Sequence, residues 1–284
     1  MLLIVPSDAL RATRPDEHFR PEVEAARAAG VEVAFVDHDA LSGGEAESGA
    51  LTRMPPSSDA VYRGWMLHSE AYAAFAAAAE RRGVIMRTSP AAYRRGHELP
   101  GWYDAFRALT PETVWTDGAD RDQFLAGLSE FAGGPVVLRD YTKSMKHYWH
   151  EAALIPDATD TDAAWRVAQR FLELRDDDFV GGFVLRRFEH FISAEVRTWW
   201  INGMCAAATA HPDTPDDNPQ PAVDITALAP VVERLELPFI TVDLRLRSDG
   251  VWRVIELGDG QVSDRPASMA PSDLINSLNV GRRA

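Results

Sequence analysis

In the N-terminal third of the chain, apolar strand-like runs alternate with helical patterns, and this feature restricts the possible folds most. The strand-like runs are MLLIVP, VEVAFVD, DAVYRG and VIMRT, and helix-like segments such as PEVEAARAAG and EAYAAFAAAAERRG lie between them. Strands that alternate with helices form a parallel sheet covered by helices. The sequence therefore predicts an N-terminal α/β domain over residues 1–117.

Basic and aromatic residues follow the third and fourth predicted strands of this domain. Ligands of a parallel sheet bind beyond the carboxyl ends of its strands, so these residues lie where a substrate would bind. Because the formal net charge of the chain is −14, an anionic ligand would need such local positive charge. Each residue alone is equally typical of a solvated or packing position. As a group, the candidates for substrate binding are Arg63, Trp65, Tyr93, Arg94 and His97.

The pattern changes after Asp117, where strand-like segments begin to follow one another. The segments PVVLRD, GFVLRRFEHF, EVRTWWING and MCAAATA, with two further strands near the C-terminus, predict an α+β domain with mainly antiparallel pairs. We expect this domain to span residues 118–284. Its small lobe would cover about 118–182 and its larger lobe about 183–284.

The last two predicted strands flank an Asp-Gly pair, which is a strong hairpin signal. With a two-residue turn, Asp243 lies directly opposite Glu256. Two facing carboxylates repel unless a cation offsets them, and oxygen ligands of this kind suit Mg²⁺. Exposed ion pairs are the alternative interpretation, and a three-residue turn would shift the register and separate the two carboxylates. Asp259 and Gln261 follow in a glycine-rich segment and are further candidate ligands.

Cationic side chains follow the strand PVVLRD. Arg139 ends this strand, and Lys143 and Lys146 lie in the loop after it. Such groups suit a triphosphate, because charge on a transferred phosphoryl group is stabilised electrostatically. The loop lacks the GxxxxGK[ST] pattern of a P-loop, and an exposed basic loop is the alternative. In EVRTWWI, Glu195 and Arg197 share one strand face, so this arginine is paired by that glutamate or by a ligand anion.

Composition excludes several other classes of protein. A hydrophobic fraction of 46% and a charged fraction of 25% are typical of a soluble globular protein. The strongly negative charge argues against a nucleic-acid partner, and no apolar run approaches the roughly 20 residues that span a bilayer. The single cysteine, Cys205, excludes an internal disulfide. The apolar opening segment lacks preceding basic residues and is typical of a strand rather than a signal peptide, so we predict a cytoplasmic protein.

The order of these segments resembles the ATP-grasp superfamily. The segments VVLRDYTKSMKHYWHEA, YRGWM and VIELGDGQVSD are similar to its clade named for two arginines and one lysine. The resemblance covers roughly Gly134 to Asp264, and the N-terminal half is similar to the domain that precedes the ATP-grasp fold in that clade. It implies an ATP- and Mg²⁺-dependent ligase that joins a carboxylate to an amine through an acyl phosphate and releases ADP and phosphate.

The resemblance also implies roles for individual positions. Asp243 and Glu256 match the Mg²⁺ ligands, and Asp259 is a possible third. The superfamily usually has an asparagine where this chain has Gly258, which leaves the metal geometry open. Arg197 matches the arginine near the γ-phosphate and the acyl phosphate.

The remaining positions implied by the resemblance concern the nucleotide. Lys143 is expected to contact the phosphates and to act with Arg197 in catalysis. The expected nucleotide-binding residues are Arg139, Lys143, Lys146, Arg186, Arg187, Phe188 and Glu195. The expected partners are small-molecule or peptide carboxylates and amines. Three other functions stay open from sequence: a small-molecule kinase, a non-catalytic nucleotide-binding module and a binding protein for a small anion.

Overall fold

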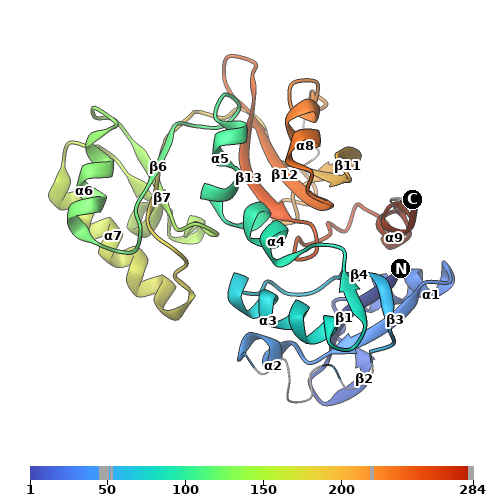
Figure 1. The fold of residues 1–284 in the computed structure, drawn as a ribbon. Helices are drawn as coiled ribbons and strands as arrows, with labels where there is room; N and C mark the ends of the chain where they lie inside the picture. The colour runs from blue at the N-terminus through green and yellow to red at the C-terminus, as the bar shows by residue number, and fades with distance from the viewer. Residues whose placement is uncertain (45–50, 52–53, 218–220, 281–284) are drawn as a thin grey trace. The chain divides into compact units, whose positions relative to one another are not determined.

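In the computed structural model, the N-terminal strands form one sheet in which parallel pairs predominate (Figure 1). The structure describes residues 1–44, 51, 54–217 and 221–280. β1 pairs in parallel with β3 and β4, and β4 pairs in parallel with β5, which confirms the predicted α/β fold. The antiparallel strand β2 was not predicted, because its five residues are mostly exposed and lack an apolar alternation. The strands are β1 (Leu2–Asp8), β2 (Arg11–Pro15), β3 (Glu32–Val36), β4 (Ser57–Tyr62) and β5 (Val84–Met86).

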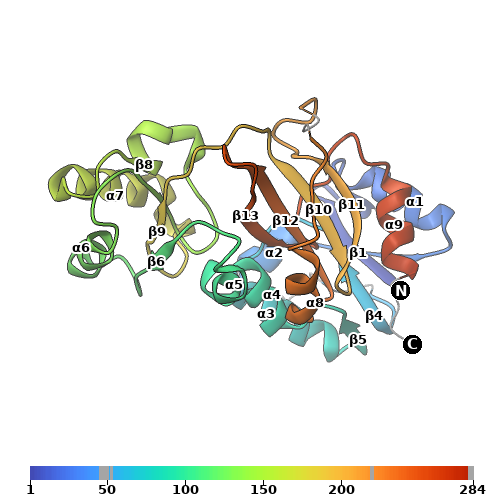
Figure 2. The same ribbon diagram turned by 90° about the horizontal axis from the view of Figure 1, so that it is seen from above.

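Helices cover both faces of this sheet. Alternate side chains of β1 face the two layers, so Leu3 and Val5 pack with one helical layer and Leu2 and Ile4 with the other. The first layer contains α1 and α9, which lie side by side in Figure 2 although they come from opposite ends of the chain. The helices are α1 (Arg20–Ala28), α2 (His38–Ser42), α3 (Ser69–Glu80) and α9 (Pro271–Val280).

A second, antiparallel sheet has the strand order β11-β10-β12-β13. Trp199 and Phe239 of this sheet belong to one buried cluster with Leu274 and Leu278 of α9. The strands were predicted from their alternation and are present in the expected order. The elements are β10 (Val196–Ile201), β11 (Met204–Ala210), α8 (Ala229–Leu235), β12 (Phe239–Leu246) and β13 (Trp252–Asp259).

The turn between β12 and β13 differs from the predicted two-residue turn. The amide of Gly250 donates to the carbonyl of Arg247, and the amide of Arg247 donates to the carbonyl of Val251. Gly250 has φ +85°, so the loop has three residues and ends in a left-handed glycine. At the other end of the hairpin, the amide of Gly260 donates to the carbonyl of Phe239. Between these pairs β13 has one residue more than β12, so a bulge compensates for the longer turn.

A third sheet has the strand order β6-β9-β7-β8 and carries α6 and α7. Phe124 of α6 and Phe171 of α7 are fully buried with Phe183 in its core. Asp160 caps α7 by accepting a hydrogen bond from the amide of Ala163. The elements are β6 (Thr113–Trp115), α6 (Arg121–Ser129), β7 (Val136–Arg139), β8 (Leu154–Ile155), α7 (Thr161–Arg175) and β9 (Val184–Arg187).

The chain forms two compact units of interleaved sequence. The first unit holds the first two sheets and the second unit holds the third sheet and the tip of the β12–β13 hairpin. The units are 1–96 with 193–244 and 256–284, and 97–192 with 245–255. This division falls at Gly96, within α4 (Pro90–His97) and before α5 (Leu99–Phe106), whereas the sequence places a domain boundary near Asp117. None of the helices in the described residues is long and apolar enough to cross a bilayer.

Candidate active site

An arginine–carboxylate pair forms the centre of the candidate site in the first unit. Arg197 of β10 lies opposite Asp243 of β12, so both side chains project from the same face of the sheet. Nε of Arg197 donates to Oδ1 of Asp243 at 2.8 Å and Nη2 donates to Oδ2 at 2.7 Å. Burial alone would raise the pKa of Asp243, but the charge and hydrogen bonds of Arg197 outweigh burial and lower it. The carboxylate is therefore held ionised by a two-bonded guanidinium.

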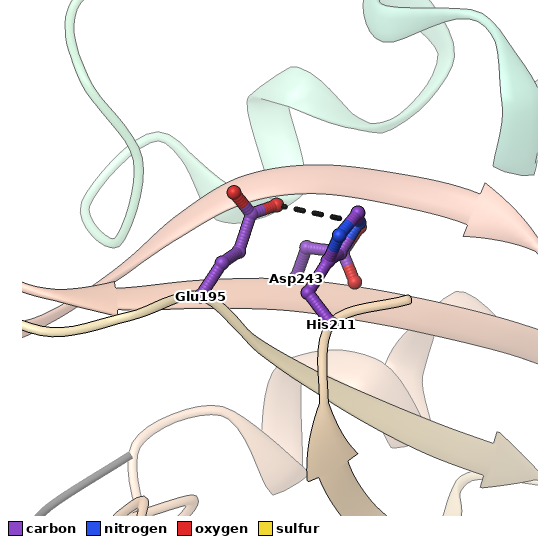
Figure 3. A group of neighbouring side chains, drawn as sticks. All are labelled: Glu195, His211 and Asp243. Atoms are coloured by element: carbon purple, nitrogen blue, oxygen red, sulfur yellow. Dashed lines mark ion pairs between the residues drawn. The ribbon is translucent and has the colours of Figure 1, made fainter. Parts of the chain in front are cut away.

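Two further side chains, Glu195 and His211, lie close to this pair, and Figure 3 draws both of them with Asp243. Nε2 of His211 lies 3.5 Å from Oδ2 of Asp243, 3.8 Å from Oε1 of Glu195 and 3.0 Å from Nη2 of Arg197. Ligand atoms of Glu195, His211 and Asp243 lie within 4.8 Å of one another. Because Glu195 and His211 flank the ends of β10 and β11, the antiparallel pairing of these strands brings them together.

Glu256 lies on the same face of the sheet as Asp243. A Cβ atom on Gly258 would lie 3.1 Å from Oγ1 of Thr241, so these two positions are neighbours on one face. Side chains two residues apart on a strand share a face, which places Glu256 beside Asp243. The charge of Glu256 also contributes to the raised pKa of Arg197. The bulge in β13 thus keeps the two carboxylates together despite the three-residue turn.

The donor set of this face fits a magnesium ion. Asp243, Glu256 and Glu195 offer carboxylate oxygens, which are the ligands that Mg²⁺ prefers, whereas the imidazole of His211 suits softer metals. Each carboxylate oxygen has a second lone pair, so the two bonds from Arg197 do not exhaust Asp243. The guanidinium of Arg197 already lies beside these carboxylates as a cation, so a metal ion bound there would share Asp243 with Arg197.

Asp259 and Gln261 do not join these carboxylates. In β13 the buried positions alternate through Leu257 and Asp259, which puts Asp259 on the face opposite Glu256. Burial raises the pKa of Asp259 to about 7. The side chain of Gln261 accepts a hydrogen bond from the amide of Tyr62 and donates to Oη of Tyr72. The expectation that Asp259 supplies a metal ligand therefore needs correction: alternation along the strand turns it into the core.

Arg63, predicted as a substrate contact, is buried and fully engaged. It is 1% exposed, and its Nε and Nη2 donate to the two carboxylate oxygens of Glu22, each at 2.9 Å. Its Nη1 donates to three carbonyl oxygens of the segment after β13. Those carbonyls belong to Gly260, Gln261 and Ser263. Arg63 thus holds the chain just beyond the carboxylate face and has a structural role.

The other four substrate candidates differ in burial. Tyr93 is fully buried, stacks on Tyr72 with ring centroids 4.0 Å apart, and donates to the carbonyl of Leu67. Arg94 is exposed and forms an ion pair with Glu70. His97 is 8% exposed and belongs to the second unit. Trp65, at 40% exposed, keeps a large surface open.

The predicted phosphate-binding loop lies in the second unit. Arg139 is buried, and its Nη2 donates to the carbonyl of Thr142 at 2.8 Å, so it braces its own loop. Asp140 accepts hydrogen bonds from the amides of Thr142 and Lys143, each at 2.7 Å, and pairs with Arg175, a partly buried residue of α7. Lys143 and Lys146 are exposed. They therefore remain candidates for binding an anion, whereas Arg139 is buried and bonded to its own loop.

The predicted hinge residues also lie in the second unit. Arg186 is buried and donates to Oγ1 of Thr110 at 2.6 Å. Arg187 pairs with Glu112 at 2.8 Å, and its guanidinium lies over the ring of Phe131. Phe188 is partly buried and remains a candidate for contact with adenine.

Comparison with known families agrees with this geometry. The family model for an ATP-grasp domain, family 3 of the clade named for two arginines and one lysine, matches residues 128–278, which is more than half of the chain. The chain belongs to this family. The match contains Arg197, Asp243, Glu256 and the basic loop around Lys143. The resemblance inferred from the sequence is therefore confirmed.

Solved structures with the same fold cover nearly the whole chain. A RimK domain ATP-grasp protein from Sphaerobacter thermophilus has 20% identity and a TM-score of 0.65, with 98% of each chain covered. D-cycloserine synthetase DcsG has 18% identity and a TM-score of 0.63, with 98% of this chain and 100% of that chain covered. The ATP-grasp ligase PsnB, solved with minimal precursor, Mg and ADP, has 16% identity and a TM-score of 0.60, covering 99% and 97%. A comparison with curated protein sequences gives no match.

The glycine that departs from the ATP-grasp superfamily pattern has a physical explanation. A Cβ atom on Gly258 would lie 3.1 Å from Oγ1 of Thr241 and 3.2 Å from Oγ of Ser263. These two hydroxyls are 2.7 Å apart and hydrogen-bonded in the space that a side chain would need. The pair of hydroxyls therefore crowds any side chain at this position, including the usual asparagine.

We expect the substitution Gly258→Asn to destabilise the protein by about 1–3 kcal/mol, the usual cost of overpacking. The midpoint of urea unfolding, followed by tryptophan fluorescence, measures this change. The double substitution Gly258→Asn with Ser263→Ala should recover part of the loss, because it opens the space. Equal stability of Gly258→Asn and the parent would contradict the packing explanation.

His211 was missed by the sequence analysis. It was not among the candidate site residues, and no local motif marks it. Its role depends on the pairing of β11 with β10, which brings the end of β11 beside Glu195. The one available signal was its position directly after a predicted strand.

Proposed function

We propose that this ATP-grasp protein is an ATP- and Mg²⁺-dependent ligase that joins a carboxylate to an amine and releases ADP and phosphate. The observation that carries the proposal is the face formed by Arg197, Asp243 and Glu256 on three adjacent strands, in a chain of the ATP-grasp family. Solved ATP-grasp neighbours include ligases, among them PsnB with Mg and ADP. The proposed substrates are a small-molecule or peptide carboxylate and an amine.

In the proposed reaction, a carboxylate oxygen attacks the γ-phosphorus of ATP and ADP leaves with the electron pair of the broken bond. The amine nitrogen then attacks the acyl carbon, the carbon–nitrogen bond forms, and phosphate leaves as the carbon–oxygen bond breaks. Neither step needs a nucleophilic side chain of the protein. The requirement is instead positive charge close to the phosphoryl oxygens.

The residues of the first unit would supply that charge. Asp243 and Glu256 would hold Mg²⁺, which when bound neutralises charge on phosphate oxygens. Arg197 carries a permanently charged guanidinium whose Nε and Nη2 are bonded to Asp243, so its charge, rather than a free donor fork, would act on the phosphate. His211, at 3.0 Å from Nη2 of Arg197, and Asp243 orient the guanidinium. Lys143 and Lys146 stay proposed phosphate contacts on the family resemblance alone.

The proposal predicts that ATP is converted to ADP and phosphate only when a carboxylate and an amine are both present. ³¹P NMR with ATP, Mg²⁺ and a pooled mixture of amino acids and peptides measures this directly. A phosphorylated product that persists without any amine would identify a kinase. AMP with pyrophosphate would identify an adenylating enzyme, and tight ATP binding without turnover would identify a binding module.

A further inference from the structure

A histidine and a carboxylate from distant parts of the chain meet on the surface of the first unit. Nε2 of His18 lies 2.7 Å from Oδ1 of Asp264, and both side chains are exposed, at 40% and 50%. Among the residues that the structure describes, Asp264 is the one hydrogen-bond partner recorded for this imidazole. If Nε2 carries the proton that bonds Asp264, the lone pair of Nδ1 is available to accept another proton.

Aromatic rings flank this pair. The ring centroid of Trp65 lies 4.5 Å from that of His18 and 4.9 Å from that of Phe19. Trp65 is 40% exposed, so part of its ring remains open to a ligand. Trp65 thus packs against His18, which itself bonds the carboxylate of Asp264. An indole binds an ammonium group through cation–π attraction, and a carboxylate binds it through an ion pair.

The pair is tied directly to the candidate active site. Nη1 of Arg197 donates to the backbone carbonyl of Asp264 at 3.2 Å, while Nε and Nη2 of the same guanidinium hold Asp243. Asp264 and Asp243 therefore bind two sides of one arginine. The backbone of Asp264 thus contacts Arg197, while its carboxylate contacts His18.

Neighbouring charged groups leave Asp264 as the carboxylate available to a ligand. Glu22 is buried and bonded to Arg63. Arg265 also lies near Glu22, with its Nε 3.4 Å from Oε1. Asp16 accepts a hydrogen bond from the backbone amide of His18 and so fixes the start of the segment before α1.

We propose that Asp264 and Trp65 bind the amine substrate as its ammonium ion and that His18 accepts the proton that this amine loses. The inference rests on the proposed ligase function and names the chemical class of the second substrate: a primary or secondary alkylamine, cationic at neutral pH. One proton passes from nitrogen to Nδ1 of His18. The neutral nitrogen then forms the carbon–nitrogen bond, and phosphate leaves with the electron pair of the carbon–oxygen bond and takes the second proton that this nitrogen loses.

Two nucleophiles of similar size separate this role from the rest of the reaction. Methylamine is largely protonated at neutral pH and needs both a cation site and a proton acceptor. Hydroxylamine is largely neutral there and traps an acyl phosphate without either. The protein is incubated with ATP, Mg²⁺ and pooled amino acids, with one nucleophile added in excess, and methylamides or hydroxamates are quantified by mass spectrometry.

We expect His18→Gln to lower methylamide formation by about 10²-fold or more, the usual contribution of a general base, with hydroxamate formation little changed. Glutamine can keep a hydrogen bond to Asp264 but cannot take a proton, so a purely structural role would leave this variant active. Asp264→Asn should raise the KM for methylamine. The matched control Glu17→Gln removes an exposed carboxylate adjacent to His18 in sequence and should change neither product.

The outcomes are distinct. Loss of methylamide with retained hydroxamate supports the inference. Equal loss of both products, or no loss of either, overturns it, and so does a parent protein that forms hydroxamates without methylamides. A parent protein that forms neither product contradicts the proposed ligase function itself. Thermal unfolding of each variant identifies any change caused by misfolding. Trp65→Phe, which keeps an aromatic ring, provides a second variant, and it too should lose methylamide formation while keeping hydroxamate formation.

Discussion

Replacement of Glu256 by Gln should abolish ADP production while the protein remains folded. The substitution keeps the size of the side chain and removes the charge that lies beside Arg197 and Asp243. Carboxylates at such a site hold the metal that neutralises the phosphates, so we expect turnover to fall by about 10²–10³-fold, as when an electrostatic contact to the reacting group is lost. ADP formation in a coupled assay, with saturating ATP, Mg²⁺ and the substrate pool, measures the effect.

A control on the same hairpin makes this prediction specific. Asp249 is an exposed carboxylate in the turn and pairs with Arg247. Asp249→Asn should therefore leave turnover close to that of the parent. If Glu256→Gln retained full activity, the assignment of Glu256 to the metal would be wrong. If ATP alone still raised the melting temperature of Glu256→Gln but Mg²⁺ added no further increase, the loss would be traced to the metal, because a ligand stabilises the state that it binds.

The sequence predicted the strands well because most of them alternate clearly. The runs that became β10, β12 and β13 alternate apolar and polar residues, and the α/β pattern of the N-terminal third is equally regular. β2 and α9 were not predicted. β2 is mostly exposed. α9 packs against β1 and α1, which lie at the other end of the chain, so its local sequence contained no indication of these partners.

At the sheet face that carries Asp243 and Glu256, two local errors in the predicted hairpin cancel. The predicted two-residue turn was wrong, because Gly250 adopts a left-handed conformation that closes a three-residue loop. An extra residue within β13 restores the register beyond it, so Asp243 and Glu256 share a face as expected. Neither the loop nor the bulge has a distinctive sequence, and the placement of Glu256 could not have been derived from the turn alone.

Burial could not be predicted for isolated arginines. Arg63 directly follows β4, and Arg94 lies in α4, the helix after β5. Arg63 is buried with Glu22, whereas Arg94 is exposed. The partner that decides the role of Arg63 lies in α1, and its other partners are backbone carbonyls beyond β13. His18 and Asp264 were missed for the same reason, since 246 positions separate them in sequence.

Removing one partner of the buried pair of Glu22 and Arg63 should destabilise the protein more than removing one partner of any exposed ion pair among the described residues. Both side chains are almost inaccessible, with 4% and 2% of their surfaces exposed. Glu22→Gln leaves the guanidinium of Arg63, and that of Arg265 nearby, without a compensating charge. Breaking a buried ion pair by removing one partner costs about 3–5 kcal/mol. We expect the urea midpoint of this variant to fall accordingly, whereas Asp104→Asn, which removes an exposed partner of Arg107, should behave as the parent.

The loss of stability caused by Glu22→Gln should depend on pH in one direction. Burial by itself would raise the pKa of Glu22, but the charge and hydrogen bonds of Arg63 outweigh it and leave the pKa lowered. A carboxyl whose pKa is lower in the folded state stabilises the protein above its unfolded pKa of about 4.3. That contribution is lost as the pH falls through the folded pKa. The difference between the parent and Glu22→Gln should thus be constant near neutral pH and shrink in acid, and a difference that grew in acid would contradict the pairing. Because Arg63 also holds the carbonyls of Gly260, Gln261 and Ser263, the loss of Glu22 should loosen the segment that carries Asp264.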